Sequence, residues 1–142
     1  RSVMPTDAER LVDTSVAVPL LFESHEHHDL VFAALEGERV SLAGHAAFET
    51  YSVLTRLPPP DRLPPALVRV LIVTNFGSTV FLTPEQSEAV AVALPEQGVA
   101  GGAVYDALVG AAAAHHRREL VTRDARAVGV YRRMGATVDL LG

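Results

Sequence analysis

The chain has 142 residues, of which 49% are hydrophobic and 20% are charged, as expected for one globular domain with a sizeable core. The formal net charge of −5 excludes a globally basic nucleic-acid-binding surface, although a local arginine patch stays open. No cysteine is present, which removes disulfides, thiol nucleophiles and thiolate zinc sites and is compatible with a reducing cytoplasm. All 12 basic residues are arginine, so enzymes that need a lysine, such as Walker A ATPases and protein kinases, are excluded.

Neither a targeting signal nor a membrane span is predicted. Residues 1–10 lack the apolar core of a secretory signal, and the most apolar long segment, 97–116, contains Asp106 and several glycines. We therefore expect a cytoplasmic protein without membrane contact, folded as a single domain over residues 1–142. Residues 1–9 are expected to be poorly ordered, and Arg1–Val3 ahead of Met4 to be a cloning remnant.

The predicted elements alternate between short apolar runs, typical of buried strands, and stretches with apolar residues at helical spacing. Turn and cap residues mark their ends, such as Gly37 after the second helix, Pro58–Pro60 after the third and Thr83–Pro84 before the fifth. Strands are predicted at 11–12, 39–42, 79–82, 119–122 and 137–140. Helices are predicted from about 16 onward and at 30–35, 46–57, 64–76, 83–94, 103–116 and 125–134.

This alternation predicts an α/β fold, a three-layer α/β/α sandwich with a mostly parallel central sheet. In such sheets ligands bind outside the carboxyl ends of the strands, so the residues that follow each strand are the first candidates for a site. Asp13 ends the first strand and Asp124 follows the strand at 119–122, so both should face the same crevice. Each has an ordinary alternative, because aspartate is also a preferred N-cap at a strand-to-helix turn.

Two further acids lie on predicted helices. Asp106 is the only formal charge between Glu96 and Arg117, and a carboxylate in such apolar surroundings needs a partner. A tertiary hydrogen bond or an arginine ion pair is its alternative. Glu49 lies at the edge of an apolar helix face with Arg56 two turns on, so a solvated helix surface is the alternative there. Together the four acids can converge into an oxygen-only site, which selects Mg²⁺ or Mn²⁺.

Four short motifs around these acids carry a resemblance to a known family. They are Val12-Asp13-Thr14-Ser15-Val16, Phe48-Glu49, Gly102-Ala103-Val104-Tyr105-Asp106-Ala107 and Leu120-Val121-Thr122-Arg123-Asp124. On these motifs, their order and their spacing, the chain resembles the PIN-domain ribonucleases from Leu11 to Leu140. Within that superfamily it looks most like VapC, the toxin of bacterial VapBC toxin–antitoxin pairs.

The resemblance implies an endoribonuclease that uses Mg²⁺, or Mn²⁺ in its place. Asp13 and Asp106 would hold the metal, with Glu49 and Asp124 completing a pocket of four catalytic acids. A divalent ion among carboxylates can lower the pKa of a bound water and stabilise charge on a phosphodiester, which needs neither cysteine nor lysine. The hydroxyl of Thr14 or Ser15, and that of Thr122, would support the carboxylates.

RNA must be bound by cations near the pocket, because the acids themselves repel phosphate. Half of the arginines lie within 117–133, and Arg123 and Arg126 adjoin the site as candidates for RNA contact. The alternative for this cluster is solvated helix faces and ion pairs with Glu119 or Asp139. The histidines at 25–28 and 115–116 are expected at the surface rather than at a zinc site.

Two protein partners are expected. A homodimer is predicted from the mean hydropathy of +0.22 and from the segment Pro64–Phe76, which has one charge and apolar residues on several faces. The alternative is a helix buried entirely inside the monomer. The resemblance also implies a cognate VapB-like antitoxin, whose arginine could engage two carboxylates at once while an apolar segment docks between helices.

Other functions stay open at this point. A noncatalytic PIN-like RNA- or protein-binding module would be expected to lack one or more of the acids. A receiver-like domain, or another Mg²⁺-binding α/β phosphohydrolase, also uses strand-end aspartates, but those with a required lysine are excluded. A nucleotide-binding α/β domain would be distinguished by nucleotide titration without metal-dependent cleavage.

Overall fold

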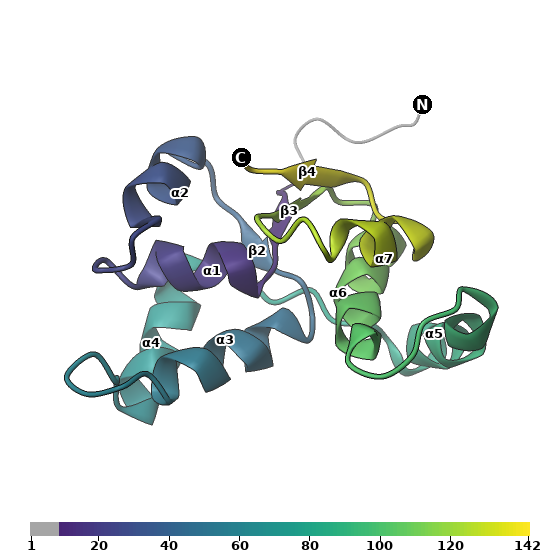
Figure 1. The fold of residues 1–142 in the computed structure, drawn as a ribbon, viewed down its shortest axis with the longest axis horizontal. Helices are drawn as coiled ribbons and strands as arrows, with labels where there is room; N and C mark the ends of the chain where they lie inside the picture. Colours follow the sequence, from purple (N-terminus) through teal and green to yellow (C-terminus); the bar gives the residue numbers. More distant parts are fainter. Residues whose placement is uncertain (1–8) are drawn as a thin grey trace.

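The computed structural model describes residues 9–142, and its centre is a small sheet with helices on both sides (Figure 1). The strands are β1 (Leu11–Val12), β2 (Ser41–Leu42), β3 (Leu120–Thr122) and β4 (Val138–Leu140), in the spatial order β2-β1-β3-β4. Every neighbouring pair is parallel. The predicted α/β/α fold with a parallel sheet is confirmed. The expectation for residues 1–8 lies outside the described residues, whereas Glu9 accepts a hydrogen bond of 3.2 Å from Ser41 Oγ.

The helices form two groups that cover opposite sides of the sheet (Figure 1). One group consists of α1 (Thr14–Leu21), α2 (His28–Ala34), α3 (Ala46–Thr55) and α4 (Pro65–Asn75). The other consists of α5 (Pro84–Glu96), α6 (Ala103–His115) and α7 (Val128–Arg133). Within residues 9–142 none of these helices has the length and apolar character needed to cross a bilayer.

The central strands are apolar on both faces because helices cover both. Leu11 and Val12 of β1 and Leu120 and Val121 of β3 are all fully buried. A strand buried on both sides has no reason to alternate polar and apolar residues, which explains the short apolar runs in the sequence. The carboxyl ends of β1 and β3 therefore lie side by side and bring Asp13 and the residues after Thr122 to the same edge.

A close contact between α6 and α7 depends on glycine. A Cβ atom on Gly110 would lie 2.9 Å from the Cα atom of Tyr131 and 3.3 Å from its carbonyl oxygen. Only a residue without a side chain lets the two backbones approach this closely. The packing places the buried ring of Tyr131 beside the end of β1.

Two expectations about the elements are wrong. The strand predicted at 79–82 reduces to one parallel bridge between Val80 and Ala43 at the sheet edge. It cannot lengthen because its neighbour β2 turns away immediately at Gly44, whose φ is +47°. The helix predicted from 125 begins only at Val128, since the preceding residues form a turn closed by a hydrogen bond from Ala127 N to the Asp124 carbonyl.

Complete burial of this segment inside the monomer was the alternative to a dimer. The structure contradicts that alternative, because α4 is only partly buried. Its inner face contributes Val68 and Ile72 to the core. Its outer face leaves Leu67, Val70 and Val73 between 43% and 57% exposed. An apolar outer face of this kind is typical of an interaction surface.

Candidate active site

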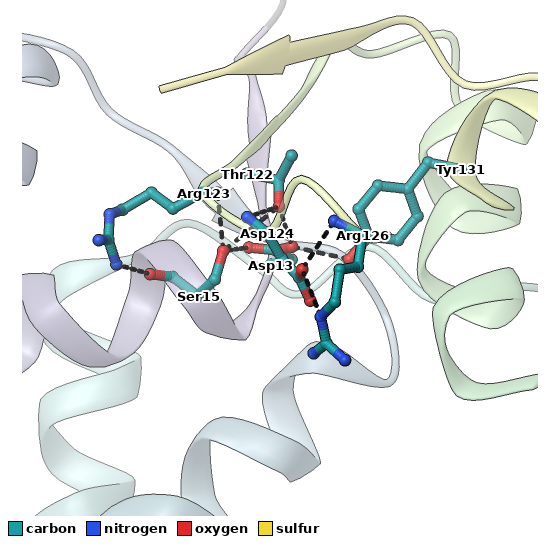
Figure 2. A network of polar contacts seen from close by, with 7 residues as sticks. All are labelled: Asp13, Ser15, Thr122, Arg123, Asp124, Arg126 and Tyr131. Atoms are coloured by element: carbon teal, nitrogen blue, oxygen red, sulfur yellow. Dashed lines mark hydrogen bonds and ion pairs between the residues drawn. The ribbon is translucent and has the colours of Figure 1, made fainter. Parts of the chain in front are cut away.

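Asp13 directly follows β1, and its carboxylate is held by three hydroxyl groups (Figure 2). Ser15 Oγ donates to Oδ1 at 2.6 Å, while Thr122 Oγ1 and the Tyr131 hydroxyl donate to Oδ2 at 2.5 and 2.7 Å. The side chain is 4% exposed, so these bonds offset the cost of burying a charge. Asp13 occupies the N-cap position of α1 but makes no side-chain capping bond, so the capping alternative is wrong for this residue.

Two of these hydroxyl groups, those of Ser15 and Thr122, also bind the loop that follows β3. Ser15 Oγ accepts a hydrogen bond of 2.8 Å from the Arg123 amide, and Thr122 Oγ1 accepts one of 3.0 Å from the Asp124 amide. Each of these two hydroxyl groups thus donates a hydrogen bond to Asp13 and accepts one from a loop amide, which fixes the loop relative to β1. Thr14 is different, because its hydroxyl donates to the Ala46 carbonyl at 3.5 Å and supports no acid.

The Asp124 side chain accepts a hydrogen bond within the turn that follows β3, close to Asp13 in the fold. Its Oδ1 accepts a hydrogen bond of 3.0 Å from the Arg126 amide and lies 3.5 Å from the Arg126 Nε (Figure 2). The Arg126 side chain is 92% exposed, so its guanidinium is accessible beside the acids. Arg123 is more constrained, because its guanidinium donates to the Ser15 carbonyl at 3.4 Å. Of the two arginines, Arg126 is the freer to meet a ligand.

Glu49 and Asp106 are half-buried carboxylates without partners. Glu49 lies in the first turn of α3 and Asp106 in the first turn of α6, as the helix predicted at 103–116 implies for Asp106. Within residues 9–142 neither side chain makes a hydrogen bond or an ion pair. The hydrogen bond or arginine ion pair that was the alternative for Asp106 is therefore not found among the described residues, and Arg56 does not pair with Glu49 there.

The pKa shifts place Asp106 within electrostatic reach of Asp13 and Asp124, and Glu49 within reach of Asp13 and Asp106. Burial raises the pKa of Asp106, and the charges of Asp124 and Asp13 raise it further, whereas Arg126 opposes them. Burial also raises the pKa of Glu49, with contributions from Asp106 and Asp13 that His45 partly offsets. This reach is compatible with the predicted convergence of two strand ends and two helices.

The donor set fits a hard divalent cation. Among residues 9–142 no three His, Asp or Glu side chains are arranged as a complete metal-binding group. Mg²⁺ does not need one, because it commonly binds through one or two carboxylates and keeps several waters. Asp13 supplies a rigid carboxylate, and Glu49 and Asp106 supply two that have no competing partner. Asp13 and Asp106, with waters completing the coordination, could hold Mg²⁺ or Mn²⁺ through oxygen alone.

Two residues of the site were not predicted from the sequence. Tyr131 was assigned to a helix without a role, because a tyrosine among apolar residues resembles core and its partner Asp13 is 118 positions away. Burial and the charge of Asp13 raise the pKa of Tyr131, so the phenol stays protonated as a donor. His45 follows β2 closely, as Asp13 follows β1, and this position at a strand end is the signal that could have identified it.

Comparisons with known proteins agree with this geometry. The family model described as PIN domain matches residues 10–133. Ribonuclease VapC27 of Mycobacterium tuberculosis (strain ATCC 25618 / H37Rv) is 47% identical over 127 residues, which cover 89% of this chain and 93% of the relative. Ribonuclease VapC40 of Mycobacterium tuberculosis (strain CDC 1551 / Oshkosh) is 43% identical over 130 residues, covering 91% and 96%.

A solved structure shares the fold at low sequence identity. It is the crystal structure of VapBC2 from Rickettsia felis bound to a DNA fragment from their promoter, with a TM-score of 0.66 and 10% identity. The match covers 95% of this chain and 100% of the other. From the family model, the two relatives and the arrangement of the four acids, the chain belongs to the PIN domain family and, within it, to the VapC ribonucleases.

Proposed function

We propose that this protein is an endoribonuclease toxin that hydrolyses RNA phosphodiester bonds at the pocket formed by its four acids. The pocket consists of Asp13, Glu49, Asp106 and Asp124. The observation that carries the proposal is the pair Glu49 and Asp106, two half-buried carboxylates within electrostatic reach of Asp13 that make no hydrogen bond or ion pair among residues 9–142. Such an arrangement is costly for stability alone and is expected where a cation is bound during function.

The chain's own residues divide the work of the reaction. Three hydroxyl groups hold Asp13 in one orientation, so it is preorganised as a metal ligand together with Asp106. Glu49 has no partner and a raised pKa, which makes it the acid best suited to accept a proton from the attacking water. A bound divalent ion supplies a water of lowered pKa and stabilises negative charge on the phosphodiester. Arg126 is placed to contact an RNA phosphate.

A VapB-like antitoxin is the proposed inhibitor. The pocket attracts cations strongly when no metal is bound, and a guanidinium can engage two carboxylates at once. An antitoxin arginine inserted between Glu49 and Asp106 would exclude the metal. A tight complex that cleaves RNA at the rate of the free enzyme would contradict this mechanism.

We further propose that two copies of the chain associate through the outer face of α4. Leu67 and Val70 are exposed there without an apolar cover among residues 9–142. Replacing Val70 by glutamate should then give a monomer in light scattering. The absence of cysteine is compatible with a reducing compartment, and we place the protein in the cytoplasm.

Acid variants test the catalytic proposal. Glu49→Gln and Asp106→Asn should each lower the rate of RNA cleavage roughly 100-fold or more, as expected when a catalytic acid or base is lost. Asp61→Asn is the matched control, because Asp61 is exposed in the loop before α4. If Asp106→Asn cleaves RNA at the rate of the control, Asp106 has no catalytic role.

A further inference from the structure

Four aromatic rings form a row beside the acid pocket. The rings of His45 and Tyr105 stack with centroids 5.0 Å apart and an interplanar angle of 19°. The Phe48 ring lies 6.2 Å from His45, and the Phe81 ring lies 5.9 Å from Phe48. We call these four residues the aromatic strip.

The aromatic strip begins at the acids themselves. Phe48 directly precedes Glu49 on α3, and Tyr105 directly precedes Asp106 on α6. Consecutive side chains on a helix point about 100° apart, so each ring lies on the face next to its carboxylate. Because Phe48 and Tyr105 each adjoin an acid of the proposed pocket, we expect the aromatic strip to lie along its rim.

Three rings of the aromatic strip are strongly exposed, and the fourth, His45, is half-buried. Phe48 is 61% exposed, and Tyr105 and Phe81 are each 50% exposed. Core packing does not account for them, because most of this aromatic surface faces away from the core clusters. A contiguous exposed apolar surface of this kind is typical of a binding site.

Charge changes sign along the aromatic strip. Beyond Phe48 and Phe81 it opens into a groove of about 800 Å³, whose only charged lining residues are Arg39 and Arg69. Arg39 lies 3.6 Å from Glu9, while Arg69 makes no ion pair within residues 9–142. A ligand that spans pocket and groove would meet acids, then rings, then arginines. This order suits a polyanion with aromatic groups whose backbone is cleaved at the acids.

We propose that the aromatic strip stacks unpaired nucleobases of single-stranded RNA next to the phosphate that is cut. The proposal rests on the function proposed above and specifies how the substrate lies at that same pocket. Unpaired bases stack on aromatic side chains whatever their sequence, because every base has a π-face. A duplex keeps its bases stacked on one another, so the aromatic strip selects unpaired segments.

The experiment measures binding separately from cleavage. The full chain in excess EDTA is titrated into a short unstructured RNA that contains 2-aminopurine, at one fixed salt concentration because phosphate binding is salt-dependent. Wild-type protein should change the 2-aminopurine fluorescence on binding and should bind the matching duplex more weakly. Phe48→Leu and Tyr105→Leu should each lower the affinity for the single strand about tenfold.

Phe32→Leu is the matched control. Phe32 is 54% exposed on α2 and contacts the ring of His28, outside the aromatic strip. This variant should bind RNA as the wild type does. Thermal unfolding and light scattering of all variants establish that folding and oligomeric state are unchanged.

The outcomes are distinguishable. Unchanged affinity in Phe48→Leu and Tyr105→Leu, or no fluorescence change with wild-type protein, overturns the proposal. Weaker RNA binding that is accompanied by dissociation of a dimer also overturns it, because the aromatic strip is then an interface between copies. Mg²⁺-dependent cleavage by the wild type is measured in parallel. Stacking without any cleavage contradicts the proposed function and leaves the assignment of the aromatic strip intact.

Discussion

The hydroxyl of Tyr131 donates a hydrogen bond of 2.7 Å to Oδ2 of Asp13, which joins the helix α7 to the end of β1 (Figure 2). Thr122 at the end of β3 donates to the same oxygen. One buried carboxylate therefore connects two neighbouring strands and a helix from distant parts of the sequence. The proposed catalytic acid is also a structural junction, so its surroundings affect both stability and activity.

Tyr131→Phe removes a donor from Asp13 and keeps the ring. Hydrogen bonds to charged groups contribute about 1.5–3 kcal/mol, so the free energy of unfolding should fall by that amount. Urea unfolding followed by circular dichroism measures the change. Tyr105→Phe is the control, because the Tyr105 phenol makes no hydrogen bond within residues 9–142, and it should change stability by less than about 0.5 kcal/mol. Equal stability of the two variants would contradict the structural role of the bond.

Gly110→Ala tests the close contact between α6 and α7. Alanine is a better helix former than glycine by about 1 kcal/mol, yet its Cβ would lie 2.9 Å from the Tyr131 Cα. The backbone of α7 must move, so we expect a net loss of about 1–3 kcal/mol and slower RNA cleavage as Tyr131 leaves Asp13. Gly129→Ala on α7 is the control, because its Cβ would meet no atom within 4 Å. That variant should be as stable as the wild type or more stable.

Much of the fold could be predicted from local patterns. The short apolar runs at 11–12 and 119–122 identified the central strands, because a strand buried on both faces need not alternate polar and apolar residues. The segment 79–82 looked equally suitable, but pairing also depends on the neighbouring strand, and β2 turns at Gly44 before a ladder can form. A sequence pattern does not contain this information about the neighbour.

The acids of the candidate site could be predicted from the sequence, but the hydroxyl groups that donate hydrogen bonds to Asp13 could be predicted only in part. Asp13 and Asp124 follow strands, and their positions at one sheet edge are a direct consequence of parallel topology. The hydroxyl of Tyr131 reaches Asp13 only because Gly110 lets two helices approach closely, which is a tertiary effect. Whether Ser15 or Thr14 faces the acid depends on the first turn of α1, and only Ser15 does.

Asp106→Asn should change stability in a pH-dependent way when metal is removed. The folded-state pKa of Asp106 is raised, so its contribution to stability is full below the unfolded pKa and is lost as pH rises through the folded pKa. In EDTA the variant should therefore match the wild type at about pH 4 and become more stable than it by about pH 7. Because the side chain is partly exposed, we expect a difference of at most about 1 kcal/mol.

Urea unfolding midpoints at the two pH values measure this effect. Asp61→Asn in an exposed loop is the control and should show no gain at neutral pH. An Asp106→Asn protein less stable than the wild type in EDTA at neutral pH would mean that Asp106 has a stabilising partner.

Arg126→Ala tests the cation beside the pocket. Its guanidinium is exposed, so its loss should leave the free energy of unfolding within about 0.5 kcal/mol of the wild type. Binding to RNA should weaken for all sequences alike, and the slope of affinity against salt should fall by about one unit. Arg56→Ala at the end of α3 is the control. An unchanged salt slope in Arg126→Ala would show that this arginine does not contact a phosphate.

If RNA is cleaved with the help of a divalent metal held by Asp13 and Asp106, cleavage must depend on that metal. Purified protein is incubated with total RNA in excess EDTA, then with Mg²⁺ or Mn²⁺ restored, with Asp106→Asn purified identically to detect contaminating nuclease. We expect no cleavage in EDTA, full recovery with either metal, and no cleavage by the variant in any condition. Cleavage by the wild type that continues undiminished in EDTA, while the variant remains inactive, would contradict it.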